Sequence, residues 1–434
     1  MQPDRRPQSI SRQGWHILVA LFMATVLSYT DRFILNILLP SVQHNLGLTD
    51  VDASLVQGLA FAVIYGAAAI PLGALADRGY GRQIVSVGVV TWSFGTAACA
   101  FAGNFPQLFA ARVVVGLGEA CLMPAAASII AEEIPYSRQG FALGLLMMGT
   151  AIGGGLSLYA GGALLSLFGS LPSIRIVPWR ATLAVLGLIG VCFAAFFLAI
   201  MRRSEPRQGT IDPRRHVRQW GEAFAFLRRN GTTLAIALGA TALLVMTDAG
   251  VSAWFPTLLM RRFALEPLVI GRTMGMIVLS AGAIASLLGP AATDWVARRF
   301  GERARFRVAA LGILAALPTF AFAKASTPIG SLTIYAPYVF AMNFAANAGI
   351  VDVQALVPTH RRGLLLALQA LTYAVIGLGL GPTAVALVTQ DFFKDSQKVG
   401  DAILAVGVAV CATALVLLML LSIARKQPRA PDSN

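Results

Sequence analysis

Six charged residues lie inside long apolar stretches of the sequence, where a charge is costly and usually serves a function. They are Asp31, Arg32, Arg112, Glu119, Asp248 and Asp352. Asp31 and Arg32 are neighbours in one stretch, and Arg112 and Glu119 are seven residues apart in another. In a helix, the second spacing places both side chains on one face, about 10 Å apart along the axis. We therefore expect Asp31, Glu119 and Arg112 to form one buried cluster.

The chemistry that this cluster would support is proton transfer. Burial favours the neutral form of a carboxyl group, whereas a nearby arginine favours the ionised form. If Arg32 or Arg112 moved relative to Asp31, the affinity of Asp31 for a proton would change with the conformation. Asp31, Glu119 and Arg112 are therefore predicted to couple protons to a conformational change. The alternative is a permanent buried salt bridge that fixes helix packing.

The sequence contains no pattern that indicates catalysis. Its histidines lie at the ends of apolar stretches or between them: His16, His44, His216 and His360. No metalloprotease or serine-elbow motif occurs, and the four cysteines are isolated inside apolar stretches. We therefore expect no enzyme activity, no cofactor, no metal site and no disulfide. A channel would need rings of charge or filter loops, which the sequence lacks.

The elements that must position these residues are membrane-spanning helices. The chain has 434 residues, of which 57% are hydrophobic and 12% charged, against about 25% charged in soluble domains. Its mean hydropathy is +0.71. A spanning helix needs about 20 mostly apolar residues, and the sequence predicts an all-α polytopic membrane protein with twelve spans. The predicted spans are 15–40, 53–75, 83–103, 106–131, 138–168, 179–201, 233–260, 271–293, 306–325, 331–358, 363–390 and 400–424.

The basic residues predict the orientation of these spans. The net charge of +14 would suggest nucleic acid in a soluble protein, but basic residues of membrane proteins gather in cytoplasmic loops. With both termini placed inside, the inner segments hold 24 Lys and Arg and the outer segments hold 8. We therefore expect both termini in the cytoplasm and no nucleic-acid partner. The preponderance of Arg over Lys favours the inner membrane of a bacterium.

The predicted spans divide into two halves of six. Residues 1–201 form the N-terminal half, 202–232 an Arg-rich cytoplasmic linker, and 233–434 the C-terminal half. The linker segment 220–227 fits an interfacial amphipathic helix or, equally, a solvated connection. An internal repeat supports the division, because Thr30-Asp31 and Thr247-Asp248 are 217 residues apart, as are Asp77 and Asp294. Transporters are commonly built from such repeats around a central site.

The segment 73–82 reads Gly-Ala-Leu-Ala-Asp-Arg-Gly-Tyr-Gly-Arg. It resembles the signature that the major facilitator superfamily carries between its second and third helices. The resemblance implies the major facilitator fold, with 12 transmembrane helices in two pseudo-symmetric halves. It also implies a conformational gate, formed by Gly73, Asp77, Arg78 and Arg82 and by Asp294 in a degenerate second copy. We expect Asp77 to face the helix N-terminus near Gly363, whose partial positive charge favours an anion.

Further motifs in the N-terminal half narrow the resemblance. They are Ser-Tyr-Thr-Asp-Arg-Phe at 28–33, Trp-Ser at 92–93, Gly-Leu-Gly-Glu-Ala at 116–120 and Pro-Ala-Ala-Ala-Ser at 124–128. Together these look like the spinster family, whose animal members are associated with export of sphingosine-1-phosphate and lysophospholipids. The Asp-Arg pair of the first span is also shared with the anion:cation symporters, which move organic acids. Span five has glycines at the spacing of the antiporter motif, but Ser157-Leu158 replaces its central Gly-Pro.

The resemblance also implies which side chains meet the substrate, because helices one, four, seven and ten line the path in this superfamily. The expected cavity residues are Arg32, Arg112, Glu119, Trp254, Asn343 and Asn347. Two arginines among apolar walls would suit a lysolipid or sphingolipid with an anionic headgroup, and the alternative is a small organic anion. The implied partners are this substrate, protons and membrane lipids. We expect the protein to act as a monomer.

Overall fold

The structure, a computed structural model, describes residues 10–171, 176–202, 213–357 and 362–424. These residues form helices and connecting turns, with no strand among them, and the predicted all-α class is confirmed. Eleven helical stretches within the described ranges are long and apolar enough to cross a membrane. One of them, Asp50–Phe101, has 52 residues and reverses at Gly79, where φ is 91°. It therefore contains two passes, and the described chain makes twelve.

The first six passes comprise nine α-helices and one π-helical turn. They are α1 (Arg12–Phe33) with α2 (Leu35–Leu46), α3 (Asp50–Gln57) with α4 (Leu59–Leu75) and η1 (Ala76–Tyr80), α5 (Gly81–Phe101), α6 (Phe105–Glu119) with α7 (Leu122–Glu133), α8 (Tyr136–Gly169) and α9 (Pro178–Arg202).

The last six passes are interrupted more often. They are α10 (Pro213–Phe263), α11 (Pro267–Ile277) with η2 (Val278–Gly282) and α12 (Ala283–Phe300), α13 (Phe306–Ala316) with η4 (Leu317–Lys324), α14 (Pro328–Ala355), α15 (Arg362–Thr372) with η6 (Tyr373–Gly379), α16 (Leu380–Leu387) and η7 (Val388–Phe392), and α17 (Val399–Ala424).

The predicted spans coincide with these passes to within a few residues at most ends. The largest differences reflect local turn chemistry. The first pass continues to Leu46, beyond the predicted end at residue 40, and stops at Gly47, whose φ of 65° suits a helix C-terminus.

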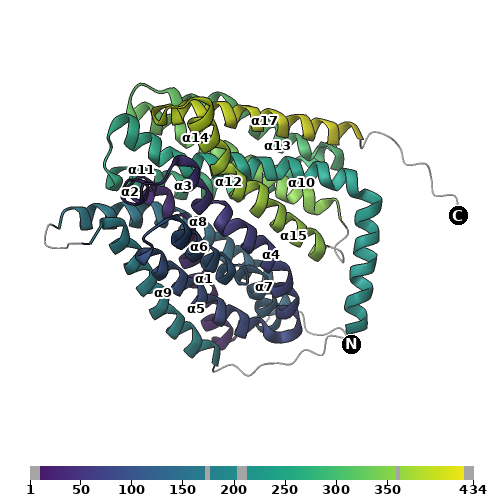
Figure 1. Cartoon of the computed structure of the whole chain (residues 1–434). Coiled ribbons are helices and arrows are strands. Elements are labelled where there is room, and N and C mark those ends of the chain that lie inside the picture. The colour runs from purple at the N-terminus through teal and green to yellow at the C-terminus, as the bar shows by residue number, and fades with distance from the viewer. Residues whose placement is uncertain (1–9, 172–175, 203–212, 358–361, 425–434) are drawn as a thin grey trace.

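Part of the predicted linker is helical. Residues 213–229 belong to α10, which departs from helical geometry only at Asn230. Figure 1 shows this first part of α10 standing apart from the bundle at an angle to the rest of the helix. The remaining linker residues, 203–212, lie outside the described ones, as do the side chains on which the amphipathic character of 220–227 depends.

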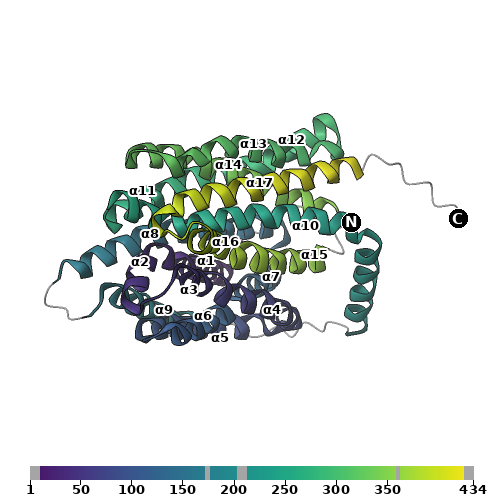
Figure 2. The ribbon, with the colours of Figure 1, turned by 45° about the horizontal axis from the view of Figure 1, so that its top comes forward.

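The passes form two groups that meet along a central interface, one of α1–α9 and one of α10–α17 (Figures 1 and 2). Contacts between the groups join α8 to α11 and η2, α2 to α10, α3 to α16 and η7, and α4 to α15 and η6. We call the end of the bundle where α1 begins and α17 ends the terminal end, and the other the opposite end.

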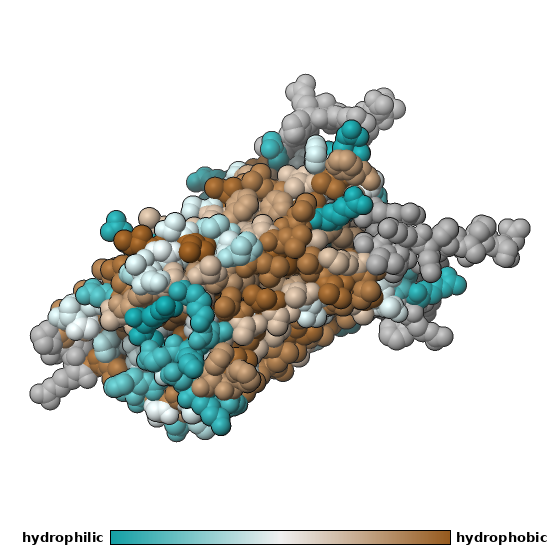
Figure 3. Space-filling view, turned by 90° about the horizontal axis from the view of Figure 1, so that it is seen from above, coloured by the Kyte–Doolittle hydropathy of each residue, from teal (hydrophilic) through white to brown (hydrophobic). Residues whose placement is uncertain are grey.

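The outer surface of the bundle is apolar. Figure 3 shows hydrophobic residues (brown) over much of the visible surface, with hydrophilic ones (teal) in separate patches. Large side chains such as Val87, Leu287 and Leu311 are exposed on helices that could span a bilayer. Lipid solvates such side chains, while the helices satisfy their own backbone groups. The chain is an integral, multi-pass membrane protein.

Candidate functional site

A buried cluster of charges lies in the first half, between α1 and α6. Arg32 donates hydrogen bonds to Oε2 of Glu119 from Nη2 (2.7 Å) and Nε (3.1 Å), and Ser28 donates to the same oxygen (2.8 Å). The guanidinium also lies 4.5–4.7 Å from the ring centres of Tyr29, Phe61 and Tyr65. These contacts hold the charge of Arg32, whose side chain is almost entirely buried.

Asp31 and Arg112 lie beside this pair but are less completely bonded. Asp31 Oδ2 accepts a hydrogen bond from Thr96 (3.2 Å), and Arg112 approaches the backbone oxygen of Arg32 (3.5 Å). Oδ1 of Asp31 and Nε of Arg112 are buried, and neither has a hydrogen-bond partner among the described residues. An acid with one free oxygen can take up a proton without breaking an existing bond.

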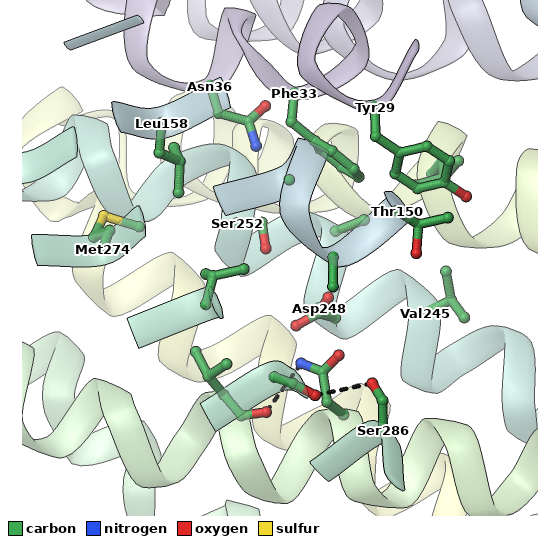
Figure 4. A pocket seen from close by; sticks show the side chains of 18 of the residues that line it. Tyr29, Phe33, Asn36, Thr150, Leu158, Val245, Asp248, Ser252, Met274 and Ser286 are labelled. Atoms are coloured by element: carbon green, nitrogen blue, oxygen red, sulfur yellow. Dashed lines mark hydrogen bonds between the residues drawn. The ribbon is translucent and has the colours of Figure 1, made fainter. Parts of the chain in front are cut away.

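A cavity of about 310 Å³ lies between the two halves, at the middle of the spans. Its N-terminal wall comes from α1, α2 and α8, and its C-terminal wall mainly from α10, α11, η2 and α14. The polar lining residues are Tyr29, Asn36, Thr150, Asp248, Ser252, Ser286, Tyr335, Asn343 and Asn347. Figure 4 shows the Asp248 carboxylate between Ser252 and Ser286, facing the open space. Asp248 is the only charged residue among the 20 that line the cavity.

The structure separates the expected cavity residues into two sets. Asn343 and Asn347 line the cavity, and Asn347 donates to Ser286 (3.3 Å) and to the backbone oxygen of Asn343 (2.8 Å). The expectation fails for Trp254 in this conformation, because its side chain is fully buried and its indole donates to the backbone oxygen of Pro382 (2.9 Å).

Arg32, Arg112 and Glu119 also lie behind the cavity wall, in the charge cluster. Tyr29 belongs to both sites, since it lines the cavity and its ring lies under Arg32. Sequence reasoning did not select Tyr29 or Ser252, whose residue types carry little signal. It considered Asp248 as the repeat of Asp31 and as a charged residue inside a span, but not as part of the cavity.

The expected gate residues of the first half lie at the terminal end, and the contacts that Gly73, Asp77 and Arg82 make among the described residues are within their own half. Gly73 faces Pro124, and the exposed Asp77 accepts a hydrogen bond from Ser128 (2.7 Å). Arg82 forms an ion pair with Glu133, and Arg78 is exposed. The residues just before the helix that contains Gly363 are outside the described ones, so the pairing of Asp77 with that helix stays a prediction.

Asp294 belongs to a second cluster at the terminal end. Arg305 pairs with Asp294 (2.7 Å) and with Glu302 (2.8 Å), and lies 3.5 Å from Asp352. Burial alone would lower the pKa of Arg305, but the hydrogen bond to Glu302 and the surrounding carboxylates raise it above its usual value. This arginine therefore ties the ends of α12 and α14 together.

Polar contacts fasten the halves to each other at the opposite end. Arg261 of α10 binds both carboxylate oxygens of Asp50 (2.6 and 3.0 Å) and reaches Gln43 (3.4 Å). Nearby, the backbone NH of Val51 donates to Gln390 (3.2 Å). Sequence reasoning missed this Arg261–Asp50 clasp, because both residues follow or precede spans as ordinary loop charges do.

A seam of close helix packing continues from the clasp toward the centre. On α8, Gly162 lies against the backbone of Pro267, and on α11, Gly271 lies against the backbone of Leu158. A β-carbon at either glycine would strike a carbonyl oxygen of the facing helix. Of the span-five glycines at the antiporter spacing, Gly162 packs against the other half, Gly153 and Gly161 pack against α1 and α2 of their own half, and Gly144 has open space beside it.

Comparison with known proteins agrees with this architecture. The sequence profile of the Major Facilitator Superfamily matches residues 21–382. The probable L-galactonate transporter of Escherichia coli is 24% identical over 367 residues, covering 80% of this chain and 78% of its own length. Protein spinster homolog 1 of Xenopus laevis is 27% identical over 400 residues, covering 87% of this chain and 73% of its own length.

A solved structure shares the fold. It is the crystal structure of a bacterial homolog to the human lysosomal transporter spinster, in an inward-facing and unoccupied conformation. The TM-score is 0.81 at 22% identity, over 98% of this chain and 100% of that one. The family consists of transporters rather than enzymes. The match of its profile over most of the chain shows that this protein belongs to the Major Facilitator Superfamily, in which it resembles the spinster proteins.

Proposed function

We propose that the chain is a proton-coupled, alternating-access transporter that moves a lysolipid- or sphingolipid-type amphiphile with an anionic headgroup through the cavity between its halves. The observation that carries this proposal is the buried Asp31, with a free oxygen, beside the Arg32–Glu119 pair. Tyr29 connects that pair to the cavity wall. The resemblance to spinster proteins supports the class of substrate.

Proton binding and conformational change would be coupled because the charges of Arg32 and Arg112 are balanced by Asp31 and Glu119. When Asp31 and Glu119 are both ionised, they balance the charges of Arg32 and Arg112. Protonation of either acid leaves a positive charge that is less well compensated, and a buried charge without a partner is expensive. The conformation that gives the arginine another partner or access to water then becomes favoured. This difference between states is what allows a proton gradient to drive transport.

A small organic anion is the second candidate substrate. The similarity to a probable L-galactonate transporter supports it. Both candidates were expected to meet arginines in the cavity. In the described conformation those arginines lie behind the wall, so an anionic group would reach them only after the Tyr29 region rearranges.

The same proposal includes the placement of the chain. The excess of Lys and Arg at the terminal end supports cytoplasmic termini, and the Arg-rich composition supports a bacterial inner membrane. The two transport halves would be 1–201 and 233–434, joined by 202–232. The protein would work as a monomer, because one chain contains both halves of the cavity.

Reconstitution tests the proposal directly. Parent protein and Asp31→Asn are placed in liposomes, and uptake of a labelled lysophospholipid is measured with and without an imposed pH gradient. We expect the gradient to accelerate transport by the parent several-fold and to have little effect on Asp31→Asn. Asp391→Asn, which removes an exposed carboxylate at the opposite end, is the matched control. Transport by Asp31→Asn that is undiminished and still driven by the gradient would refute coupling through Asp31.

A further inference from the structure

Asp248 is a carboxylate that the chain itself leaves without a partner. It lies in the middle of α10 and faces the cavity (Figure 4). Among the described residues, none forms a hydrogen bond or ion pair with this side chain. A carboxylate inside a membrane protein normally has a cation, a set of donors or water as its partner. The cavity is the space from which such a partner would come.

Comparison with the other half of the internal repeat shows that Asp248 lacks the neighbouring arginines of its counterpart. Its counterpart Asp31 is followed by Arg32, whereas Asp248 is followed by Ala249. In the first half the fourth pass contributes Arg112 and Glu119 to the charge cluster. In the second half the corresponding pass, α14, has no charged residue before Asp352, near its end. The second half has therefore kept the acid of the pattern without the arginines that accompany it.

The remaining lining fits a positively charged group. The rings of Tyr29, Phe33 and Tyr335 border the same cavity, and the faces of aromatic rings attract cations, quaternary ammonium groups included. Asn343 and Asn347 offer amide oxygens nearby. No lining residue is cationic, so an isolated anion would meet only the like charge of Asp248.

We infer that Asp248 is the recognition residue for an ammonium group, and that the cavity takes the amine- or choline-type headgroup of a zwitterionic amphiphile. This inference rests on the proposed function and adds a positively charged nitrogen to the anionic headgroup proposed there. The cavity of about 310 Å³ is at the lower end of the range of about 300–1,000 Å³ that is usual for ligand pockets. That space suits a headgroup, so the hydrocarbon tail extends beyond the cavity.

Comparing two lysolipids of equal chain length isolates the contribution of the ammonium group to binding. Lysophosphatidylcholine carries it, and lysophosphatidic acid lacks it. Binding of each to purified protein in nanodiscs is measured by calorimetry for the parent, Asp248→Asn and Asp248→Glu. We expect Asp248→Asn to weaken binding of lysophosphatidylcholine by about tenfold or more, because the charge attraction between the carboxylate and the quaternary ammonium, which has no N–H to donate, is lost. Binding of lysophosphatidic acid should be unchanged or stronger, and Asp248→Glu should retain the preference of the parent.

Control measurements protect the interpretation. Asp391→Asn should bind both lipids like the parent, and thermal unfolding checks that each variant is folded. The inference is overturned if Asp248→Asn weakens both lipids equally or neither. The inference is also overturned if Asp248→Asn keeps the preference of the parent for lysophosphatidylcholine but binds with a different pH dependence. That result would indicate that Asp248 is a proton site.

Failure of the proposed function has a different signature. A parent protein that binds lysophosphatidylcholine through Asp248, but shows no transport in liposomes, contradicts the transport proposal and leaves the inference standing.

Discussion

Arg32 is held by two unlike kinds of contact, and this makes its partner Glu119 an informative residue to change. The carboxylate supplies a full opposite charge, while three aromatic rings supply only weaker attraction. Removing the charge of Glu119 would leave Arg32 buried with the rings alone. Breaking a buried ion pair costs about 3–5 kcal/mol. An isosteric amide that still accepts hydrogen bonds should cost less.

We expect Glu119→Gln to fold but to lose part of the pH dependence of transport. The amide oxygen can accept the hydrogen bonds of Ser28 and Arg32, yet it cannot bind or release a proton in this range. Transport rates in liposomes across a series of pH values give the measurement. Glu132→Gln, an exposed site at the end of the same pass, is the control. A pH profile of Glu119→Gln that overlays that of the parent would assign the pair a structural role only.

The sequence predicts which residues form the charge cluster, but it does not predict which of them pair with each other. The sequence identified Asp31, Arg32, Arg112 and Glu119 because charges are rare in apolar stretches. It did not indicate that Arg32, and not Arg112, is the partner of Glu119. Adjacent residues in a helix point about 100° apart, so the rotation of α1 decides which of them meets α6. That rotation depends on packing across several helices.

Helix positions were predictable because the bilayer fixes the length of an apolar span. Irregular segments inside the helices were not. The π-helical segments η2 and η6 interrupt two passes and contribute Val278, Gly282 and Leu378 to the cavity wall. Hydropathy does not report such a change of register, which often accompanies a functional site. For the linker, the sequence left 220–227 open between an amphipathic helix and a solvated connection, and the helix in the structure begins earlier, at Pro213.

The Arg261–Asp50 clasp makes a prediction about one element, α10. We expect Arg261→Gln to weaken closure at the opposite end, since it removes both bonds to Asp50. Losing a surface ion pair costs about 0–1 kcal/mol, and breaking a buried pair costs about 3–5 kcal/mol. The cost for this partly buried pair should lie between these values. A loss near 1.4 kcal/mol would shift the two-state population about tenfold. Spin labels on α2 and α11 at the opposite end, read by distance measurement, report the shift.

The neighbouring arginine provides a matched control. Arg262 donates to the backbone oxygens of Ala323 and Lys324, within its own half. Arg262→Gln removes the same charge at the same depth without touching the contact between halves. Equal distance distributions for the two variants would show that the clasp does not determine closure.

At the scale of the whole molecule, the described conformation is fastened at the opposite end by the clasp and the glycine seam. Alternating access requires a second conformation in which the terminal end closes. Asp77 is placed to act there. In the described conformation its bond from Ser128 lies within one half, so it favours neither arrangement of the halves.

We therefore expect Asp77→Asn to shift the population toward the described conformation. The amide oxygen can still accept the Ser128 hydrogen bond, whereas the attraction of a charge to a facing helix N-terminus is lost in the second conformation. That attraction is worth about 0.3–1 kcal/mol, a change of about two- to fivefold. Distances between spin labels on η1 and α12 measure it, with Glu302→Gln as control. A shift toward a closed terminal end would contradict the latch role of Asp77.

The Tyr29 ring, placed between the cavity and Arg32, has a consequence for the energetics of the cycle. Under the proposed coupling, proton binding at the charge cluster and substrate binding in the cavity would be linked through this ring, and such linkage is reciprocal. Whatever factor a proton at the charge cluster applies to the affinity for substrate, the substrate applies to the affinity for the proton. The cargo is then an effector of its own driving ion. The charge cluster would then bind protons to a different extent when the cavity is empty and when it is filled, at the same external pH. The larger this difference, the fewer protons would cross the membrane without substrate.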